Sequence, residues 1–288
     1  MSQTLLICTD LDRTLIPNGP QPESPGARER FAALVKHPEV SLAYVSGRDR
    51  ALVQEAILEY DLPTPGFVVG DVGTTMYRVG SGDGWQRLTD WETDIARDWA
   101  GVGHDDLRHR LVELPELQPQ EDTKQNLYKI SFYVSLESRG EALEEALRER
   151  LESAGVKARL IWSVDDLHGT GLLDILPARA SKYHAVDTLR SLHGLECAST
   201  VFCGDSGNDL EVLASPIPAV LVANAGPDVR ESALRLADEA GNGELLYCAR
   251  GGFMGMNGHY SAGILEGVAH YHPHTLEWMG FDPARVGA

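Results

Sequence analysis

The first third of the chain alternates between two kinds of apolar pattern. Continuous apolar runs at residues 5–8, 40–45 and 66–69 are separated by segments at 27–37 and 51–62 whose apolar residues recur with helical spacing. Strands buried on both faces of a parallel sheet are apolar along most of their length, and helices connect one strand to the next. The alternation therefore predicts a parallel sheet with helices on both of its faces.

The pattern changes in the middle of the chain. Residues 127–136 alternate like a half-buried strand, with Tyr128, Ile130, Phe132 and Val134 on one face, and residues 156–164 form a second amphipathic strand. Helical patterns at 104–114 and 139–155 accompany them. Helices packed on one side of an antiparallel sheet predict a small α+β domain, inserted at 88–170.

Strand and helix patterns like those of the first third resume after the insert. Strands are expected at 172–177, 199–204 and 219–223, helices at 181–194, 210–215 and 262–271, and a Gly-rich loop precedes the last helix. The predicted fold class is α/β, with a Rossmann-like parallel-sheet core formed by 1–87 and 171–288 and the smaller α+β domain between them.

The composition narrows the classes of partner. The 288 residues are 43% hydrophobic and 24% charged, as in a globular protein, and the formal net charge of −18 argues against nucleic acid or an anionic membrane as a partner. No apolar stretch approaches the roughly 18 residues that span a bilayer. The four cysteines form no C-x-x-C pair and are expected to be free thiols. With no signal-peptide pattern at the N-terminus, a cytoplasmic location is expected.

Polar residues gather where the predicted strands end. Asp10 and Asp12 follow the first strand, Ser46 follows the second, and Asp205 follows a later one. The carboxyl ends of parallel strands lie along one edge of the sheet, where ligands bind. Hard oxygen ligands such as these carboxylates suit Mg²⁺, which would lie between Asp10 and Asp12 and relieve their repulsion.

Two features near this edge are suited to an anion. Ser46 and the backbone amides of the "SGR" turn (46–48) precede a helix, whose N-terminus attracts negative charge. Lys182 begins a later helix and provides a positive charge for a second anionic oxygen.

These motifs, in their order, resemble those of a known superfamily. "DLDRTL" (10–15), "SGR", Lys182 and "GDSGND" (204–209) are similar to the four motifs of the haloacid dehalogenase (HAD) phosphatases. The insert resembles the cap domain of the sugar phosphatases in that superfamily. The segments "YKISFYV", "DILP", "GDSGNDLEVL" and "SAGILEGVAHY" look most like those of the sucrose-phosphate phosphatases.

The resemblance implies a role for each motif residue. Asp10 would attack phosphorus and form an aspartyl-phosphate, and Asp12 would exchange protons with the leaving group and with water. Lys182 would assist catalysis and bind phosphate. Asp10, the backbone carbonyl of Asp12, and Asp205 would bind Mg²⁺, with Asp209 in support. The remaining phosphate-binding residues would be Ser46, Gly47, Arg48 and Asn208.

Sugar recognition is expected to lie mainly in the cap, which would close over the substrate. The candidate sugar contacts are Lys129, on the polar face of a predicted cap strand, and Gly73 and Thr74 in the "DVGTTMY" turn. Two departures from the family pattern stand out. Arg13 replaces a small or short polar residue, and leucines at 172 and 173 occupy a region where sucrose-phosphate phosphatases carry an Asp.

Three functional interpretations follow. The first is a Mg²⁺-dependent phosphatase that hydrolyses a sugar phosphate, with sucrose 6-phosphate as the leading substrate. The second is a sister activity on mannosylfructose-phosphate or mannosyl-3-phosphoglycerate, which the leucine departure keeps open. The third is a non-catalytic sugar-phosphate sensor or a partner subunit of a sugar-phosphate synthase, against which the complete set of catalytic groups argues. Association with such a synthase is also compatible with the first interpretation.

Overall fold

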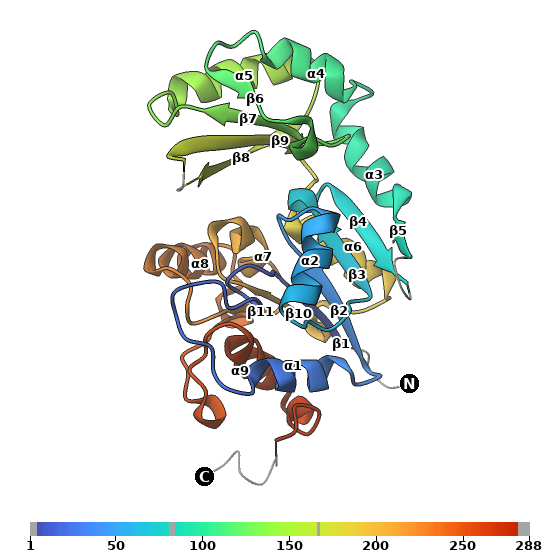
Figure 1. Ribbon diagram of the computed structural model, residues 1–288, viewed down its shortest axis with the longest axis vertical. Helices are drawn as coiled ribbons and strands as arrows, with labels where there is room; N and C mark the ends of the chain where they lie inside the picture. The colour runs from blue at the N-terminus through green and yellow to red at the C-terminus, as the bar shows by residue number, and fades with distance from the viewer. Residues whose placement is uncertain (1–4, 81–83, 166–167, 282–288) are drawn as a thin grey trace. The chain divides into compact units, whose positions relative to one another are not determined.

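The computed structural model describes residues 5–80, 84–165 and 168–281. Two residues of the "DLHGTGLLDILP" segment, at 166 and 167, lie outside these ranges, as do the chain ends included in the predicted domain limits. The chain divides into two compact units, one formed by Met1–Arg87 with Lys182–Ala288 and the other by Leu88–Ser181 (Figure 1). Each unit has its own sheet, helices and apolar core.

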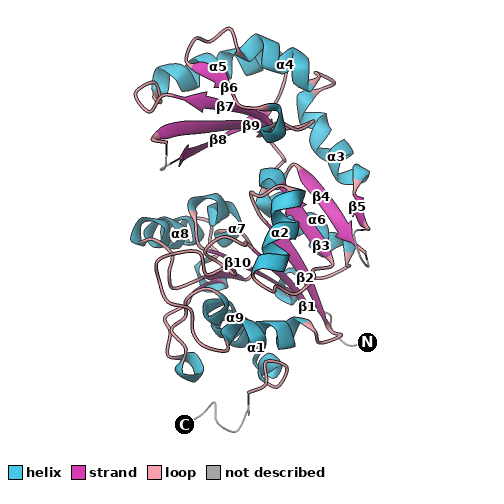
Figure 2. Ribbon diagram, in the orientation of Figure 1, coloured by secondary structure: helices cyan, strands magenta, loops and turns pink. Residues whose placement is uncertain are grey.

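The larger unit is built on a mixed eight-stranded sheet in the order β12-β11-β10-β1-β2-β3-β4-β5 (Figure 2). Its strands are β1 (Leu5–Thr9), β2 (Val40–Val45), β3 (Phe67–Gly70), β4 (Thr75–Val79), β5 (Trp85–Arg87), β10 (Thr200–Gly204), β11 (Ala219–Leu221) and β12 (Leu246–Cys248). All neighbours from β12 to β3 pair in parallel, and β4 and β5 add antiparallel strands at one edge. The parallel-dominated sheet is the predicted α/β architecture.

Helices cover this sheet and bury its apolar side chains. They are α1 (Ala27–Val35), α2 (Arg50–Glu59), α6 (Lys182–Leu192), α7 (Leu210–Leu213), α8 (Pro227–Glu239) and α9 (Ser261–Tyr271). Phe31 and Leu34 of α1 share one apolar cluster with Ile264 and Leu265 of α9 and with Ile7 of β1. The central strands are therefore shielded from solvent, and polar side chains are accommodated at the strand ends.

The smaller unit is a separate α+β structure. Its four-stranded antiparallel sheet has the order β6-β7-β9-β8, and its strands are β6 (Leu117–Pro119), β7 (Ile130–Val134), β8 (Ala158–Asp165) and β9 (Thr170–Pro177). Its helices are α3 (Thr89–Ala96), α4 (His104–Leu111) and α5 (Glu141–Ser153). Trp99, Leu107, Phe132, Leu147 and Ile175 are buried in its own core.

The strand β9 corrects the sequence interpretation. The segment "LLDILP" was expected to return to the parallel sheet, but it pairs with β7 and β8 in the smaller unit, which continues to Ser181. Leu173 and Ile175 of β9 pack into that unit's core. An alternating apolar pattern identifies a strand but not the sheet that it joins, because the pairing partner is distant in sequence. Helices α3 and α8 and the short strand β12 were not predicted.

Two expectations from the composition concern free thiols and membrane-spanning segments. All four cysteines are free, and burial raises the pKa of the Cys8 thiol far above its usual range. Cys8 and Cys203 lie in the neighbouring strands β1 and β10. Across the described residues, no helix has the length and apolar character that crossing a membrane requires.

Candidate active site

The parallel register brings three of the predicted polar segments to one edge of the sheet. Thr9, the last residue of β1, pairs with Tyr44 of β2 and with Cys203 of β10. Asp10 continues β1, and its N–H donates to the Cys203 carbonyl at 2.9 Å. The chain segments that follow β1, β2 and β10 therefore leave the sheet side by side, which accounts for the meeting of residues almost 200 positions apart.

A buried ion cluster lies at this edge. Lys182 is the first residue of α6 and only 4% exposed. Its Nζ donates to Asp209 Oδ1 at 2.7 Å and lies 3.1 Å from Asp10 Oδ2. Both carboxylates are themselves buried. Removing charged groups from water costs free energy, so buried charges are found where they are closely paired or where they serve a reaction.

Asp209 has a second role that fixes the geometry of its loop. Its Oδ2 accepts the backbone N–H groups of Asp205 and Ser206, each at 3.0 Å, and the Ser206 hydroxyl also donates to it at 3.2 Å. Ser206 and Asp209 form a capping box, in which the side chain of each accepts the backbone N–H of the other. A Cβ at Gly204 would lie 2.5 Å from this carboxylate. Glycine is therefore needed at this position, and the "GDSGND" spacing follows from the turn that Asp209 closes.

Electrostatics in the cluster favour a cation. Burial raises the pKa of Asp10 to about 7, with a further increase from Asp209, although Lys182 opposes the shift. Burial and Asp209 raise the pKa of Asp205 to about 6. Burial opposes the charge on Lys182, but the two neighbouring carboxylates outweigh it and raise the Lys182 pKa. One buried cation does not balance three carboxylates.

The donor set of the cluster fits a hard divalent metal. Asp10, Asp205 and Asp209 each offer an oxygen, and these oxygens lie within 4.8 Å of one another. Both carboxylate oxygens of Asp209 accept hydrogen bonds, one from Lys182 and the other from backbone N–H groups. Asp10 and Asp205 are therefore better placed to bind the metal directly. The Asp205 Oδ1 also accepts the Thr14 hydroxyl at 3.1 Å. All-oxygen sites of this kind suit Mg²⁺.

Asp12 lies apart from the carboxylate cluster. Its Oδ2 accepts Arg48 Nε at 2.8 Å, its Oδ1 accepts Arg48 Nη2 at 2.7 Å, and Asn18 Nδ2 donates to Oδ1 at 2.7 Å. Burial opposes ionisation of Asp12, but these donors prevail and lower its pKa. Asp12 is therefore held as a carboxylate, and its partner is the side chain of Arg48, a residue predicted to bind phosphate.

The other predicted phosphate ligands lie at the same edge. Ser46 follows β2 and is 1% exposed; its N–H donates to Val69 O, and its hydroxyl accepts the Arg48 N–H at 3.2 Å. Gly47 is exposed at the turn before α2. Asn208 is also exposed, and its Oδ1 accepts the Ser206 hydroxyl at 3.0 Å.

The predicted sugar contacts are distributed over both units. Gly73 and Thr74 are buried at the end of a short 3-10 turn after β3, and the Thr74 hydroxyl donates to the Asp71 carbonyl. Lys129 belongs to the smaller unit, where it precedes β7 and bridges to Asn126 through its backbone. Ser131, two residues further along the chain, is buried, and its hydroxyl donates to Asp174 at 2.5 Å.

Sequence reasoning missed several supporting residues. Thr14 bonds to Asp205, Asn18 bonds to Asp12, and Asn224 links the Arg13 carbonyl to the Tyr260 N–H. Thr14 belongs to the "DLDRTL" motif, so a signal for it existed. Asn18 and Asn224 lie in loops whose conformations have no periodic signature, and no pattern in the sequence marks them.

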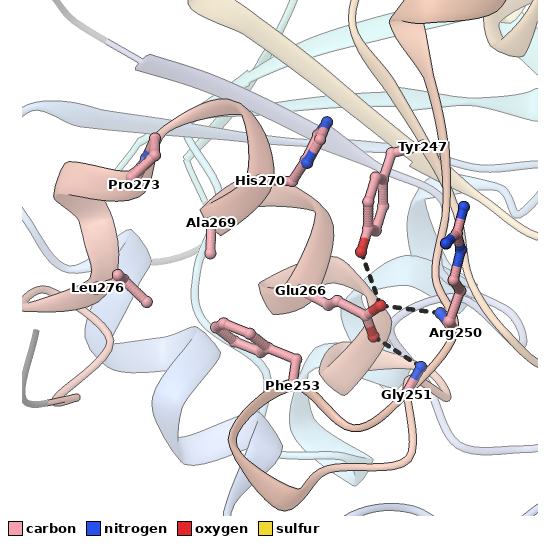
Figure 3. A pocket seen from close by; sticks show the side chains of 9 residues that line it. All are labelled: Tyr247, Arg250, Gly251, Phe253, Glu266, Ala269, His270, Pro273 and Leu276. Atoms are coloured by element: carbon pink, nitrogen blue, oxygen red, sulfur yellow. Dashed lines mark hydrogen bonds between the residues drawn. The ribbon is translucent and has the colours of Figure 1, made fainter. Parts of the chain in front are cut away.

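A separate cavity of about 430 Å³ lies between β12 and α9, away from the carboxylate cluster (Figure 3). The carboxylate of Glu266 is buried at one wall and accepts Tyr247 Oη and the backbone N–H groups of Arg250 and Gly251, all within 3.0 Å. Burial and this hydrogen bond raise the pKa of Tyr247 to about 12. Three donors satisfy Glu266, so it joins β12 and the following loop to α9.

Comparison with known proteins defines the class. The sucrose-phosphatase of Synechocystis sp. PCC6803, solved with sucrose and phosphate, superposes with a TM-score of 0.70 at 23% identity, covering 94% of this chain and 98% of its own. A haloacid dehalogenase-like hydrolase of Bacillus subtilis superposes with a TM-score of 0.64 at 18% identity, covering 93% and 92% of the two chains. Both structures share the parallel-dominated α/β fold of this chain, which is the fold class that the sequence predicted.

The match to a family model assigns the chain to one family within the HAD superfamily. The family model for sucrose-6F-phosphate phosphohydrolase matches residues 3–272, so this chain belongs to that family of HAD sugar phosphatases, which are phosphoric monoester hydrolases. A HAD-like hydrolase of Nitrosococcus oceani is 50% identical over 97% of this chain and 75% of its own length. Sucrose-phosphatase 1 of Nicotiana tabacum is 29% identical over 93% of this chain, which spans 59% of that relative.

Proposed function

We propose that this protein is a Mg²⁺-dependent phosphatase that hydrolyses sucrose 6-phosphate to sucrose and phosphate. The observation that carries the proposal is the buried group formed by Asp10, Lys182 and Asp205 at the carboxyl ends of β1 and β10. It combines a nucleophilic carboxylate, a fixed cation and hard oxygen ligands in one place. Phosphoryl transfer depends on positioning and on charge stabilisation, and this group supplies both.

The proposed reaction has two halves. In the first, a carboxylate oxygen of Asp10 forms a bond to phosphorus as the bond from phosphorus to the sugar oxygen breaks, and Asp12 gives that oxygen a proton. In the second, water attacks the aspartyl-phosphate, Asp12 takes the proton of the water, and phosphate leaves Asp10. Lys182 holds Asp10 in place and offsets charge on the phosphoryl oxygens. Bound Mg²⁺ would supply Lewis-acid stabilisation of those oxygens.

The contact with Arg48 indicates that Asp12 is ionised when no substrate is bound. With its pKa lowered by Arg48, Asp12 is a carboxylate, the form that accepts a proton from water in the second half. The first half requires protonated Asp12. We therefore propose that Arg48 leaves Asp12 when the phosphate ester binds, and that Arg48 serves to position Asp12 rather than to bind phosphate.

Family membership supports sucrose 6-phosphate, and the polar face of the cap sheet is where the sugar would be distinguished. Leu172 occupies the position of the Asp that is usual in sucrose-phosphate phosphatases, and its register neighbour on β7 is Tyr133. Asp174 lies two residues further along the same face of β9 and binds Ser131. Asp174 belongs to the "DILP" segment that matches the family, so the departure at Leu172 removes one acidic group from this face. That loss keeps mannosylfructose-phosphate and mannosyl-3-phosphoglycerate as competing substrates.

A panel of phosphate esters tests the proposal directly. Phosphate release from sucrose 6-phosphate, mannosylfructose-phosphate and mannosyl-3-phosphoglycerate is measured with Mg²⁺ and after exhaustive chelation, and kcat/KM is compared across the panel. We expect sucrose 6-phosphate to have the highest kcat/KM and chelation to remove the activity. A higher kcat/KM for another ester would make that ester the preferred substrate in place of sucrose 6-phosphate. Binding without turnover of any ester would indicate a sugar-phosphate sensor.

The cellular setting belongs to the same proposal. Free thiols at Cys8 and Cys203 are compatible with a reducing compartment, so we propose the cytoplasm. A transferase that makes the sugar phosphate is the expected partner, because the phosphatase consumes its product. Copurification with such a synthase from the source cells, measured with and without the smaller unit's surface charges intact, tests the association.

A further inference from the structure

Arg13 has a backbone conformation that its residue type does not favour. Its φ of 57° lies in the left-handed region, where glycine and asparagine are accommodated more easily than a long side chain. The conformation is held from both sides, because Asn18 Oδ1 accepts its N–H at 2.8 Å and Asn224 Nδ2 donates to its carbonyl at 2.6 Å. The backbone therefore gives no reason for arginine, and the reason must lie in the side chain.

The guanidinium of Arg13 lies at the mouth of the carboxylate cluster. Its Nε is 3.6 Å from Asp205 Oδ2, and the Arg13 side chain is 47% exposed whereas that of Asp205 is 4% exposed. A separation of 3.6 Å is an ion pair without a hydrogen bond. Within the described ranges, the Arg13 guanidinium donates no hydrogen bond to protein, so its N–H groups face solvent beside the cluster.

In the structure, two other cations of the site are paired with carboxylates. Lys182 is buried between Asp10 and Asp209, and the guanidinium of Arg48 binds both oxygens of Asp12. Arg13 differs from both, because it is near the cluster, partly exposed and rich in unused donors. The loop at Gly19 passes beside it, since a Cβ there would lie 3.5 Å from Arg13 Nε, which limits the directions that the side chain can take.

We infer that Arg13 binds the phosphate group of the substrate and of the phosphate product. A guanidinium presents paired N–H groups that match two phosphate oxygens, and a site whose carboxylates outnumber its buried cations needs added positive charge to admit a dianion. Arg13 would thus add a guanidinium to the phosphate-binding residues that the sequence predicted. The inference rests on the proposed function, because it assumes that a phosphate monoester reaches the Asp10 cluster.

Inorganic phosphate is the probe for this contact, because it carries no sugar. Its inhibition constant against hydrolysis of p-nitrophenyl phosphate is measured with Mg²⁺ for the wild type, Arg13→Gln and Arg13→Lys. Phosphate binding without turnover is measured in parallel by calorimetry. We expect Arg13→Gln to weaken phosphate about tenfold by both methods, and Arg13→Lys to stay within about threefold of wild type because it keeps the charge. Arg235→Gln, which removes an exposed charge on α8, is the matched control and should bind phosphate as wild type does.

The outcomes separate this inference from the proposed function. Equal phosphate binding by wild type and Arg13→Gln would overturn the role of Arg13 while leaving the phosphatase intact. A change confined to Mg²⁺ affinity, with phosphate binding unchanged, would also overturn it, since Arg13 would then act only on Asp205. A wild type that neither hydrolyses an ester nor binds phosphate would overturn the proposed function first. Thermal unfolding of Arg13→Asn, whose side chain suits the left-handed backbone, controls for a structural role and should show no loss of Tm.

Discussion

The two units treat charge in opposite ways. The larger unit buries Lys182 with Asp10, Asp205 and Asp209, each no more than 5% exposed. In the smaller unit, the pairs Arg148–Glu145 and Arg150–Glu113 join side chains that are 33–61% exposed.

Burying an ion costs several kcal/mol, whereas an exposed pair contributes at most about 1 kcal/mol. The closely paired buried charges that could serve a reaction therefore lie in the larger unit, whereas these ion pairs of the smaller unit lie at its surface. The smaller unit does bury some polar groups, and two of them have clear hydrogen-bond partners. Ser131 donates to Asp174, and the Asp98 carboxylate accepts the backbone N–H of Arg179 at 2.7 Å. Such groups are suited to fixing the sheet and to recognising hydroxyls, and not to stabilising a developing charge.

Four substitutions or conditions test this difference between the two units, beginning with the largest expected effect.

Asp10→Asn should abolish turnover and leave the fold intact. The amide has nearly the size of the carboxylate but is a poor nucleophile, and Lys182 keeps its bond to Asp209. We expect activity to fall by at least about a thousandfold, or about 4 kcal/mol in activation free energy. Steady-state phosphate release measures the loss, and circular dichroism confirms folding. A variant that kept more than a few per cent of wild-type activity would exclude Asp10 as the nucleophile.

Mg²⁺ binding should depend steeply on pH, because the metal competes with protons. Burial raises the pKa of Asp10 to about 7 and that of Asp205 to about 6, and both must ionise to bind metal. Binding should be about a hundredfold weaker near pH 5.5 than near pH 8. Both pKa values exceed those of the unfolded chain, so in the metal-free protein these groups lose stabilising effect as the pH rises from about 4 to about 7. Calorimetry and the Mg²⁺-induced shift in Tm, each at both pH values, measure this; equal binding at the two would contradict the cluster as the metal site.

Glu266→Ala should destabilise the larger unit by about 2–3 kcal/mol. It removes a buried carboxylate that three donors bind and leaves the N–H groups of Arg250 and Gly251 without their acceptor. Arg148→Ala, which breaks an exposed ion pair in the smaller unit, is the control and should change the free energy of unfolding by less than about 0.5 kcal/mol. Urea unfolding measures both. Similar losses from the two variants would remove the contrast between the units.

Lys129→Ala should have the smallest effect, and only on sugar recognition. If Lys129 contacts the sugar, KM for the preferred disaccharide phosphate should rise about tenfold, a loss of roughly 1.4 kcal/mol in binding. Hydrolysis of p-nitrophenyl phosphate should scarcely change. Equal losses on both substrates would assign Lys129 to phosphate binding or to the fold, and unchanged kinetics on both would place the sugar contact on another residue of the smaller unit.

Much of the architecture was readable from the sequence, because it depends on local pattern. Apolar runs that end in Asp10, Ser46 and Asp205 identify strands and the edge where their ends meet, since parallel pairing leaves little choice of side. The turn of "GDSGND" is likewise local, because Asp209 bonds to backbone groups only three and four residues before it. Short-range periodicity and turn chemistry carry this information within a window of a few residues.

The tertiary structure alone decided the remaining points. The "LLDILP" strand joined the smaller sheet, Arg48 turned to Asp12, and Arg13 took a left-handed conformation held by Asn18 and Asn224. Each outcome depends on partners that are distant along the chain, as in the bond from Thr14 to Asp205 across 191 positions. The free energy of such contacts is set by the packing of the whole unit and by the burial it imposes, and no local segment of the sequence contains that sum.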